Sequence, residues 1–161
     1  MKTLIVYYSL EGNTKYAAEK IAEAIGADTL RLYPKKPYAD KGVSKFLWGG
    51  KSALMADKPE LLLYKTDLSE YGRILFGFPV WASNFTPPLR TFVLDHQDEI
   101  RGKHLAAFAC ESGAGGEKAL AKLAQAIGTD GFEATAIFID PKKKQSAKTD
   151  AAIADFIEEL K

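Results

Sequence analysis

A short polar segment at residues 9–14 has the residue types that bind a phosphate group. It joins an apolar run at residues 3–8 to a segment with helical periodicity. The first N–H groups of a helix lack partners within the helix and carry a partial positive charge. A glycine lets the backbone turn tightly around an anion, and short polar side chains add hydrogen bonds. The candidate phosphate-binding residues are therefore Ser9, Leu10, Glu11, Gly12, Asn13 and Thr14.

Other phosphate loops do not match this segment. The chain has neither Gly-x-x-x-x-Gly-Lys-Ser/Thr nor Gly-x-Gly-x-x-Gly, which disfavours a nucleoside triphosphatase and a dinucleotide site. Lys15 follows the loop, so we expect hydroxyls and amides to hold a phosphate monoester without a basic side chain inside the loop. Ser9 or Asn13 could instead cap the helix with no ligand bound. The residues of the loop alone leave both interpretations open.

The order of the predicted elements places this loop in an α/β domain. Apolar runs predict parallel strands at residues 3–8, 28–33, 73–78, 104–110 and 134–139. Helical spacing is seen at residues 14–25, after Pro88, around residues 120–127 and from residue 148 onward, with a further helical piece around residues 43–56. The stretch 35–70 is otherwise unassigned. This alternation predicts one domain over residues 1–161, a three-layer α/β sandwich whose ligands bind beyond the carboxyl ends of the strands.

The polar loop also carries a resemblance to a known family. Ser9, Gly12, Asn13 and Thr14 match the Ser/Thr-x-x-Gly-Asn-Thr phosphate loop of the flavodoxin-like family, which directly follows the first strand. Strand count and loop order agree over nearly the whole chain, and the fifth strand lacks the long insertion of the larger flavodoxins. The chain thus resembles short-chain flavodoxins. The resemblance implies a five-stranded parallel sheet of order 2-1-3-4-5 and one non-covalently bound flavin mononucleotide (FMN).

The same resemblance implies that two further loops hold the isoalloxazine ring. Trp81 could cover one face of the ring, whereas Phe85 is predicted to belong to the core. Glu111, if its side chain pointed outward, would disfavour the anionic reduced flavin. Cys110 is predicted to be a buried thiol and not a nucleophile. The implied ring-binding residues are Pro79, Val80, Trp81 and Ala82 after the third strand, and Cys110, Glu111, Ser112, Gly113, Gly115 and Gly116 after the fourth.

The composition of the chain bears on which classes of binding partner are expected. The chain has 22 Lys plus Arg and 21 Asp plus Glu, a formal net charge of +1, so nothing global favours nucleic acid or an anionic membrane. No apolar stretch approaches the ~20 residues that cross a bilayer. One cysteine excludes an intrachain disulfide, and the cytoplasm is the expected location. The cluster Lys142–Lys144 is expected to be a solvated loop. His96 and His104 show no partner pattern and are expected to be structural.

Three functions compete at this stage. An electron-transfer protein would pass electrons to a redox partner protein, while an FMN-dependent oxidoreductase would move two electrons from NAD(P)H to a small acceptor such as a quinone. The near-neutral charge weakens the carrier interpretation, because carriers of this family are usually acidic. The loop 79–88 also lacks the glycine that often permits a peptide flip beside the ring. A receiver-type signalling domain is disfavoured, because Phe78-Pro79 replaces its phosphorylated aspartate. The oligomeric state stays open.

Overall fold

The protein forms one parallel β-sheet with helices on both faces, as seen in a computed structural model that describes residues 1–38 and 56–161. The strands are β1 (Thr3–Tyr7), β2 (Asp28–Arg31), β3 (Arg73–Pro79), β4 (His104–Glu111) and β5 (Ala134–Ile139). They pair in the order β2-β1-β3-β4-β5. The register places Val6 of β1 between Leu30 of β2 and Phe76 of β3. The expected sheet order is confirmed.

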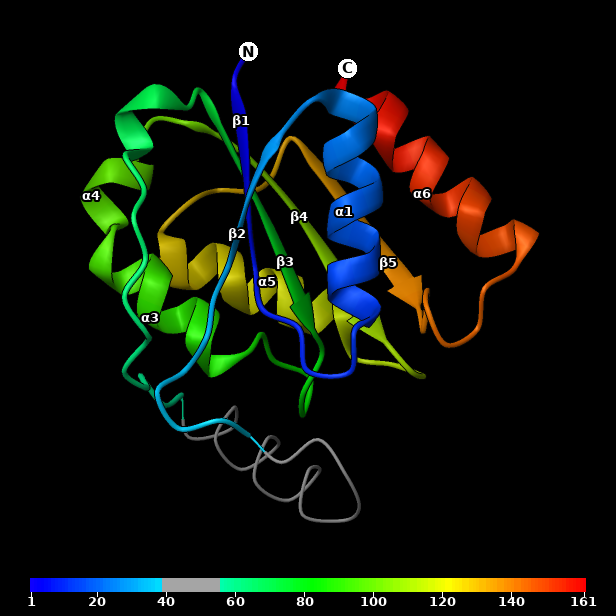
Figure 1. Cartoon of the computed structure of the whole chain (residues 1–161), viewed down its shortest axis with the longest axis horizontal. Coiled ribbons are helices and arrows are strands. Elements are labelled where there is room, and N and C mark those ends of the chain that lie inside the picture. Colours follow the sequence, from blue (N-terminus) through cyan, green and yellow to red (C-terminus); the bar gives the residue numbers. More distant parts are fainter. Residues whose placement is uncertain (39–55) are drawn as a thin grey trace.

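Helices cover the two faces in separate groups (Figure 1). Helices α1 (Asn13–Ile25) and α6 (Ala147–Leu160) pack together on one face. Helices α3 (Pro87–Asp95) and α5 (Gly116–Ile127) cover the other, and the short α4 (Gln97–Ile100) follows α3. A single 3-10 turn, η1 (Leu68–Glu70), precedes β3. The result is the predicted three-layer sandwich.

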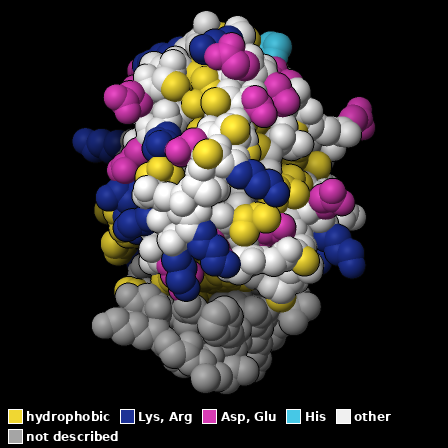
Figure 2. Space-filling view, turned by 90° about the vertical axis from the view of Figure 1, so that its right-hand side faces the viewer, with side chains coloured by type: hydrophobic (Ala, Val, Ile, Leu, Met, Phe, Trp, Pro, Cys, Tyr) yellow, Lys and Arg dark blue, Asp and Glu magenta, His cyan; other side chains and the backbone are white. Residues whose placement is uncertain are grey.

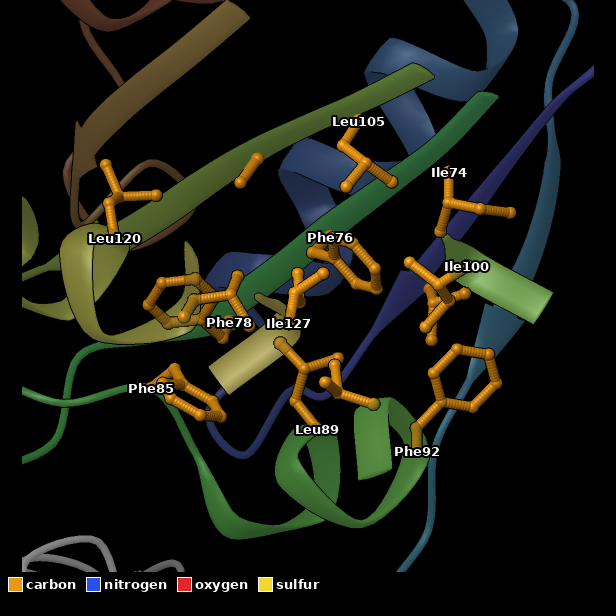
Figure 3. Close-up of a cluster of buried hydrophobic side chains, with 14 of the residues drawn as sticks. Ile74, Phe76, Phe78, Phe85, Leu89, Phe92, Ile100, Leu105, Leu120 and Ile127 are labelled. Atoms are coloured by element: carbon orange, nitrogen blue, oxygen red, sulfur yellow. The ribbon is translucent and has the colours of Figure 1, made fainter. Parts of the chain in front are cut away.

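The alternation of side chains along each strand fills a core on both faces. Ile74, Phe76 and Phe78 point from β3 toward α3 and α5, where they meet Leu89, Phe92 and Leu120 (Figure 3). Leu75 points to the opposite face and belongs to a second cluster, with Ile5, Phe108, Ile21, Ile153 and Phe156. Apolar residues on both faces explain the unbroken hydrophobic runs of these strands.

One glycine of β3 is required by its neighbour. A Cβ atom on Gly77 would lie 2.3 Å from Cζ of Phe108, the residue paired with it on β4. Only glycine leaves room for this aromatic ring, which itself packs against Phe138 with 5.7 Å between ring centroids. Gly77 therefore belongs to the core packing directly beneath the loop that follows β3.

Several boundaries differ from the sequence expectation. Strand β2 ends at Arg31, two residues early, and Leu32 turns into the core instead. Residues 33–35 then run antiparallel to residues 60–62, through hydrogen bonds from Leu62 N to Tyr33 O (2.7 Å) and from Lys35 N to Glu60 O (2.8 Å). The predicted helical piece at residues 43–56 lies, but for its last residue, outside the described residues.

Candidate functional site

A pocket opens at the carboxyl ends of β1, β3 and β4, the edge of the sheet toward which the arrowheads of β3 and β5 point in Figure 1. Three loops and the residue after β5 build it. Its lining residues are Ser9, Leu10, Glu11, Asn13 and Thr14 from the first loop, Pro79, Val80, Trp81 and Ala82 from the second, Cys110, Glu111 and Ser112 from the third, and Asp140. The sequence predicted every one of these except Asp140. The predicted Gly12, Gly113, Gly115 and Gly116 do not line it.

The β1–α1 loop offers unsatisfied hydrogen-bond donors. Gly12 has a φ of 99° and is the N-cap residue of α1, where it offers no side chain of its own to cap the first turn. Ser9 Oγ accepts the N–H of Lys15 at 3.2 Å. Within the described residues, the N–H groups of Gly12, Asn13 and Thr14 have no hydrogen-bond acceptor. The expected cap is therefore present for one N–H, through Ser9, whereas Asn13 does not cap the helix. The other donors remain available to an anion.

The Thr14 hydroxyl is a second unsatisfied group in this loop. Thr14 is 1% exposed, and its Oγ1 has no hydrogen-bond partner within residues 1–38 and 56–161. Burial raises the pKa of the neighbouring Cys110 thiol to about 12, and the Thr14 hydroxyl offsets this rise only in part. The hydroxyl thus lies near the sulfur without forming a well-aligned hydrogen bond to it. A buried hydroxyl left unpaired costs about 1–3 kcal/mol, so its position favours a ligand oxygen at this point.

Asn13 serves a purpose that the sequence did not reveal. Its Oδ1 accepts the backbone N–H of Lys142 at 2.9 Å and of Lys143 at 3.1 Å. These bonds fasten the β5–α6 loop to the β1–α1 loop across 129 residues of sequence. No local pattern signals such a contact, because both partners of the side chain are backbone groups of a distant loop.

The β3–α3 loop forms a tight turn without glycine. Trp81 and Asn84 exchange backbone hydrogen bonds of 3.1 Å and 3.0 Å, and between them Ala82 and Ser83 have φ values of 50° and 56°. Two successive left-handed residues define a type I′ turn, which normally selects Asn or Gly. We expected the missing glycine to make this loop costly to rearrange; the structure shows that the loop already holds the strained conformation.

Aromatic side chains form one side of the pocket entrance. Trp81 lines the pocket and meets Tyr8 and Tyr38 edge to face, with ring centroids 5.7 Å and 5.2 Å away. Tyr8 is buried, which raises the pKa of its phenol. Phe85 is 1% exposed, packs on Phe78 and lies under the Arg90 guanidinium, so the prediction of a core role is confirmed. The contacts with Tyr8 and Tyr38 hold Trp81 in the wall of the pocket.

The acidic residue of the β4–α5 loop, Glu111, forms a hydrogen bond to the first turn of α5. Glu111 Oε2 accepts the N–H of Gly116 at 2.8 Å, so its carboxylate caps α5 and stabilises the positive end of that helix. A Cβ atom on Gly116 would lie 2.7 Å from the same oxygen. Glu111 thus lines the pocket while one of its carboxylate oxygens is bonded to the helix. Gly115, with a φ of 100°, brings this loop against Ser83, whose Cα would be 3.1 Å from an added Cβ.

Asp140 is the lining residue that sequence reasoning missed. It follows β5, is 5% exposed and has a φ of 40°. Its Oδ1 accepts the Ser112 hydroxyl at 2.9 Å, and its Oδ2 pairs with Lys144 Nζ at 3.2 Å. Because parallel strands end at one edge of a sheet, the residue after β5 could have been included by position alone.

The two histidines do have partners, but away from the pocket. His96 contacts Tyr64 Oη at 2.7 Å and Glu99 Oε1 at 2.6 Å, and His104 contacts Glu133 Oε2 at 2.9 Å. Over residues 1–38 and 56–161, no group of three or more His, Cys, Asp or Glu could hold a metal ion. In the same residues no helix is long and apolar enough to cross a membrane.

A sheet of this order with a pocket at its carboxyl edge defines the flavodoxin-like class of α/β proteins. Solved structures of that class superpose on the chain. A flavoprotein from Lactobacillus acidophilus, in complex with FMN, matches with a TM-score of 0.75 at 21% identity, covering 96% of this chain and 97% of its own. The two-electron reduced flavodoxin of Megasphaera elsdenii matches with a TM-score of 0.61 at 18% identity, covering 98% and 96%.

The apo-form of a flavoprotein from Lactobacillus acidophilus matches with a TM-score of 0.64 at 25% identity, covering 90% of this chain and 97% of that one. A family model described as flavodoxin matches residues 2–160. The chain therefore belongs to the flavodoxin family. This result excludes the receiver-type alternative, consistent with Phe78-Pro79 at the end of β3.

Proposed function

We propose that this protein binds one FMN in the pocket at the carboxyl ends of β1, β3 and β4, and that it acts in electron transfer. The observation that carries the proposal is the buried Thr14 hydroxyl without a partner, beside three unpaired N–H groups of the β1–α1 loop. A phosphate monoester would accept hydrogen bonds from all of them. The FMN complex of a structurally similar flavoprotein and the family membership support this assignment.

The two remaining loops suit the flat ring of the flavin. Trp81 offers an aromatic side chain, and Cys110, Glu111 and Ser112 of the β4–α5 loop line the same pocket. FMN, when bound, would accept and donate one or two electrons. The chain contributes orientation and exclusion of water.

Three ionisable side chains of the pocket lining have structural contacts or are deeply buried. The Cys110 thiol stays protonated at neutral pH, since burial raises its pKa to about 12. The Glu111 carboxylate caps α5, and the Asp140 carboxylate holds Ser112 and Lys144. These three groups thus take part in the structure of the pocket. We propose a redox partner protein as the electron acceptor, with a small acceptor such as a quinone as the alternative.

Cofactor binding is tested by titrating the purified apoprotein with FMN and following flavin fluorescence. The expected result is a yellow protein that takes up one FMN per chain. Anaerobic stepwise reduction then separates the two functions. A carrier should accumulate half-reduced flavin and oxidise NAD(P)H slowly, whereas rapid NAD(P)H oxidation with quinones would favour the oxidoreductase. A colourless protein that does not take up FMN would refute both.

A further inference from the structure

The β5–α6 loop brings a lysine side chain onto the phosphate-binding loop. A Cβ atom on Gly12 would lie 3.0 Å from Lys142 Nζ and 3.2 Å from its Cδ, so the side chain covers the face of this glycine. The backbone of Lys142 is held there by its hydrogen bond to Asn13 Oδ1. The lysine ammonium therefore lies at the turn that begins α1.

The charge of Lys142 is not used elsewhere. Lys15 pairs with Glu19 at 3.6 Å, and Lys144 pairs with Asp140 at 3.2 Å. Lys142, in contrast, has no carboxylate partner among residues 1–38 and 56–161. An unpaired ammonium beside unsatisfied N–H donors is an arrangement that a bound anion would complete.

A second cation supports the same loop from behind. Arg31 Nη2 donates a hydrogen bond of 3.0 Å to the backbone carbonyl of Ser9. Ser9 and Thr14 of this loop line the pocket, and the buried Thr14 hydroxyl has no partner among residues 1–38 and 56–161. Two positive side chains thus reach a loop whose own sequence contains none. The sequence expectation of a phosphate held without a cation did not foresee contributions from β2 and the β5–α6 loop.

We infer that Lys142 is a phosphate-binding residue that makes this protein selective for a phosphorylated flavin over riboflavin. The inference rests on the proposed FMN site and adds a residue to it. The phosphate of FMN carries nearly two negative charges at neutral pH, and backbone amides offset them only in part. An ammonium at this turn attracts this charge and does not interact with the phosphate-free ring system.

The test compares Kd values of FMN and riboflavin in three variants at low and high ionic strength. For Lys142→Gln we expect FMN binding ~10-fold weaker at low salt, and riboflavin binding changed by less than ~2-fold. Lys142→Arg keeps the charge and should retain most of the affinity for FMN. Lys148→Gln, an exposed lysine in the first turn of α6, is the matched control and should bind FMN like the wild type. The difference between wild type and Lys142→Gln should shrink at ~1 M salt.

The outcomes separate this inference from the proposed function. Wild-type protein that binds neither FMN nor riboflavin would refute the FMN site itself. Wild-type protein that binds FMN, combined with a Lys142→Gln variant of equal FMN affinity, would overturn the role of Lys142 and leave the FMN site standing. Equal weakening of FMN and riboflavin would also overturn it, since the effect would then not come from the phosphate. Lys142 is exposed, so the variant is expected to fold, which circular dichroism checks.

Discussion

At the scale of single residues, the site contains polar groups without a hydrogen-bond partner among the described residues and polar groups whose hydrogen bonds stabilise the pocket walls. Thr14 belongs to the first kind, because its buried hydroxyl has no partner. Glu111 belongs to the second, because its carboxylate caps α5. The two can be told apart by what their removal does to the apoprotein and to the complex.

Replacing Thr14 by valine should act in opposite directions on these two states. The shape is kept while a buried unpaired hydroxyl disappears, so the free energy of unfolding of the apoprotein should stay equal or rise by up to about 1 kcal/mol. FMN affinity should fall roughly tenfold, because a donor to the phosphate is lost. Urea denaturation of the apoprotein and an FMN titration measure the two effects. Thr14→Ser keeps the hydroxyl and should bind FMN nearly as the wild type does; tight FMN binding by Thr14→Val would contradict the assignment.

Site residues could be predicted from the sequence where their role depends on neighbouring residues in the chain. The loop 9–14 was found because a glycine and short polar side chains before a helix favour an anion. The cap formed by Glu111, the position of Asp140 and the contact of Lys142 with Gly12 were not found. The Glu111 cap depends on the path of its own loop, whereas the positions of Asp140 and Lys142 depend on where the β5–α6 segment lies, more than a hundred residues from Gly12 in the sequence.

At the scale of elements, the pocket depends on how the β3–α3 and β4–α5 loops touch. Gly115 has a φ of 100°, and a Cβ atom there would lie 2.9 Å from Ser83 Oγ and 3.1 Å from Ser83 Cα. Ser83 itself is left-handed. The contact thus joins two strained backbones, and it sets the distance between the walls that would hold the ring.

Gly115→Ala should lower the free energy of unfolding by about 1–3 kcal/mol, since alanine at positive φ is strained and its methyl group would push Ser83 away. FMN affinity should fall with it, because the two walls separate. Gly113→Ala is the matched control in the same loop, where an added Cβ meets nothing within 4 Å, and it should change neither quantity by much. Thermal unfolding and an FMN titration of both variants give the answer, and equal behaviour of the two would count against the contact.

Strands and helices could be predicted where the pattern of apolar residues was long and regular. All five strands and the helices α1, α5 and α6 follow from apolar runs and helical stripes. The short η1 and α4 were missed, because three or four residues are too few to show a period. The start of η1 could have been suspected from Asp67, whose carboxylate accepts the N–H of Ser69 at 3.0 Å, a local N-cap contact.

At the scale of the whole molecule, positive and negative side chains are interspersed. Figure 2 shows Lys and Arg among Asp and Glu on the side of α6, and the formal net charge is only +1. A partner would thus not be guided by a strong long-range field. Recognition of a redox partner is instead expected to depend on contacts at the pocket edge, with weak dependence of the association rate on salt.

Global stability can be followed through the only cysteine. Cys110 is 5% exposed and its thiol pKa is raised to about 12 by burial, so alkylation at neutral pH requires the pocket region to open. Labelling by iodoacetamide should be slow in the apoprotein, fast in urea, and slower still with saturating FMN, because a ligand that binds only the folded state stabilises it. Mass spectrometry over time measures this; rapid labelling of the FMN-saturated protein would contradict the placement of Cys110 at the buried wall.

The link between Asn13 and the backbone of Lys142 has a consequence for the order of assembly. During synthesis, the first loop of the site is made early, but the groups that fix the Asn13 side chain are made only after β5. A nascent chain therefore displays the turn around Gly12 long before its final geometry exists. We expect the nucleotide to bind only after β5 has joined the sheet. The ligand would then stabilise the completed fold and would not nucleate folding.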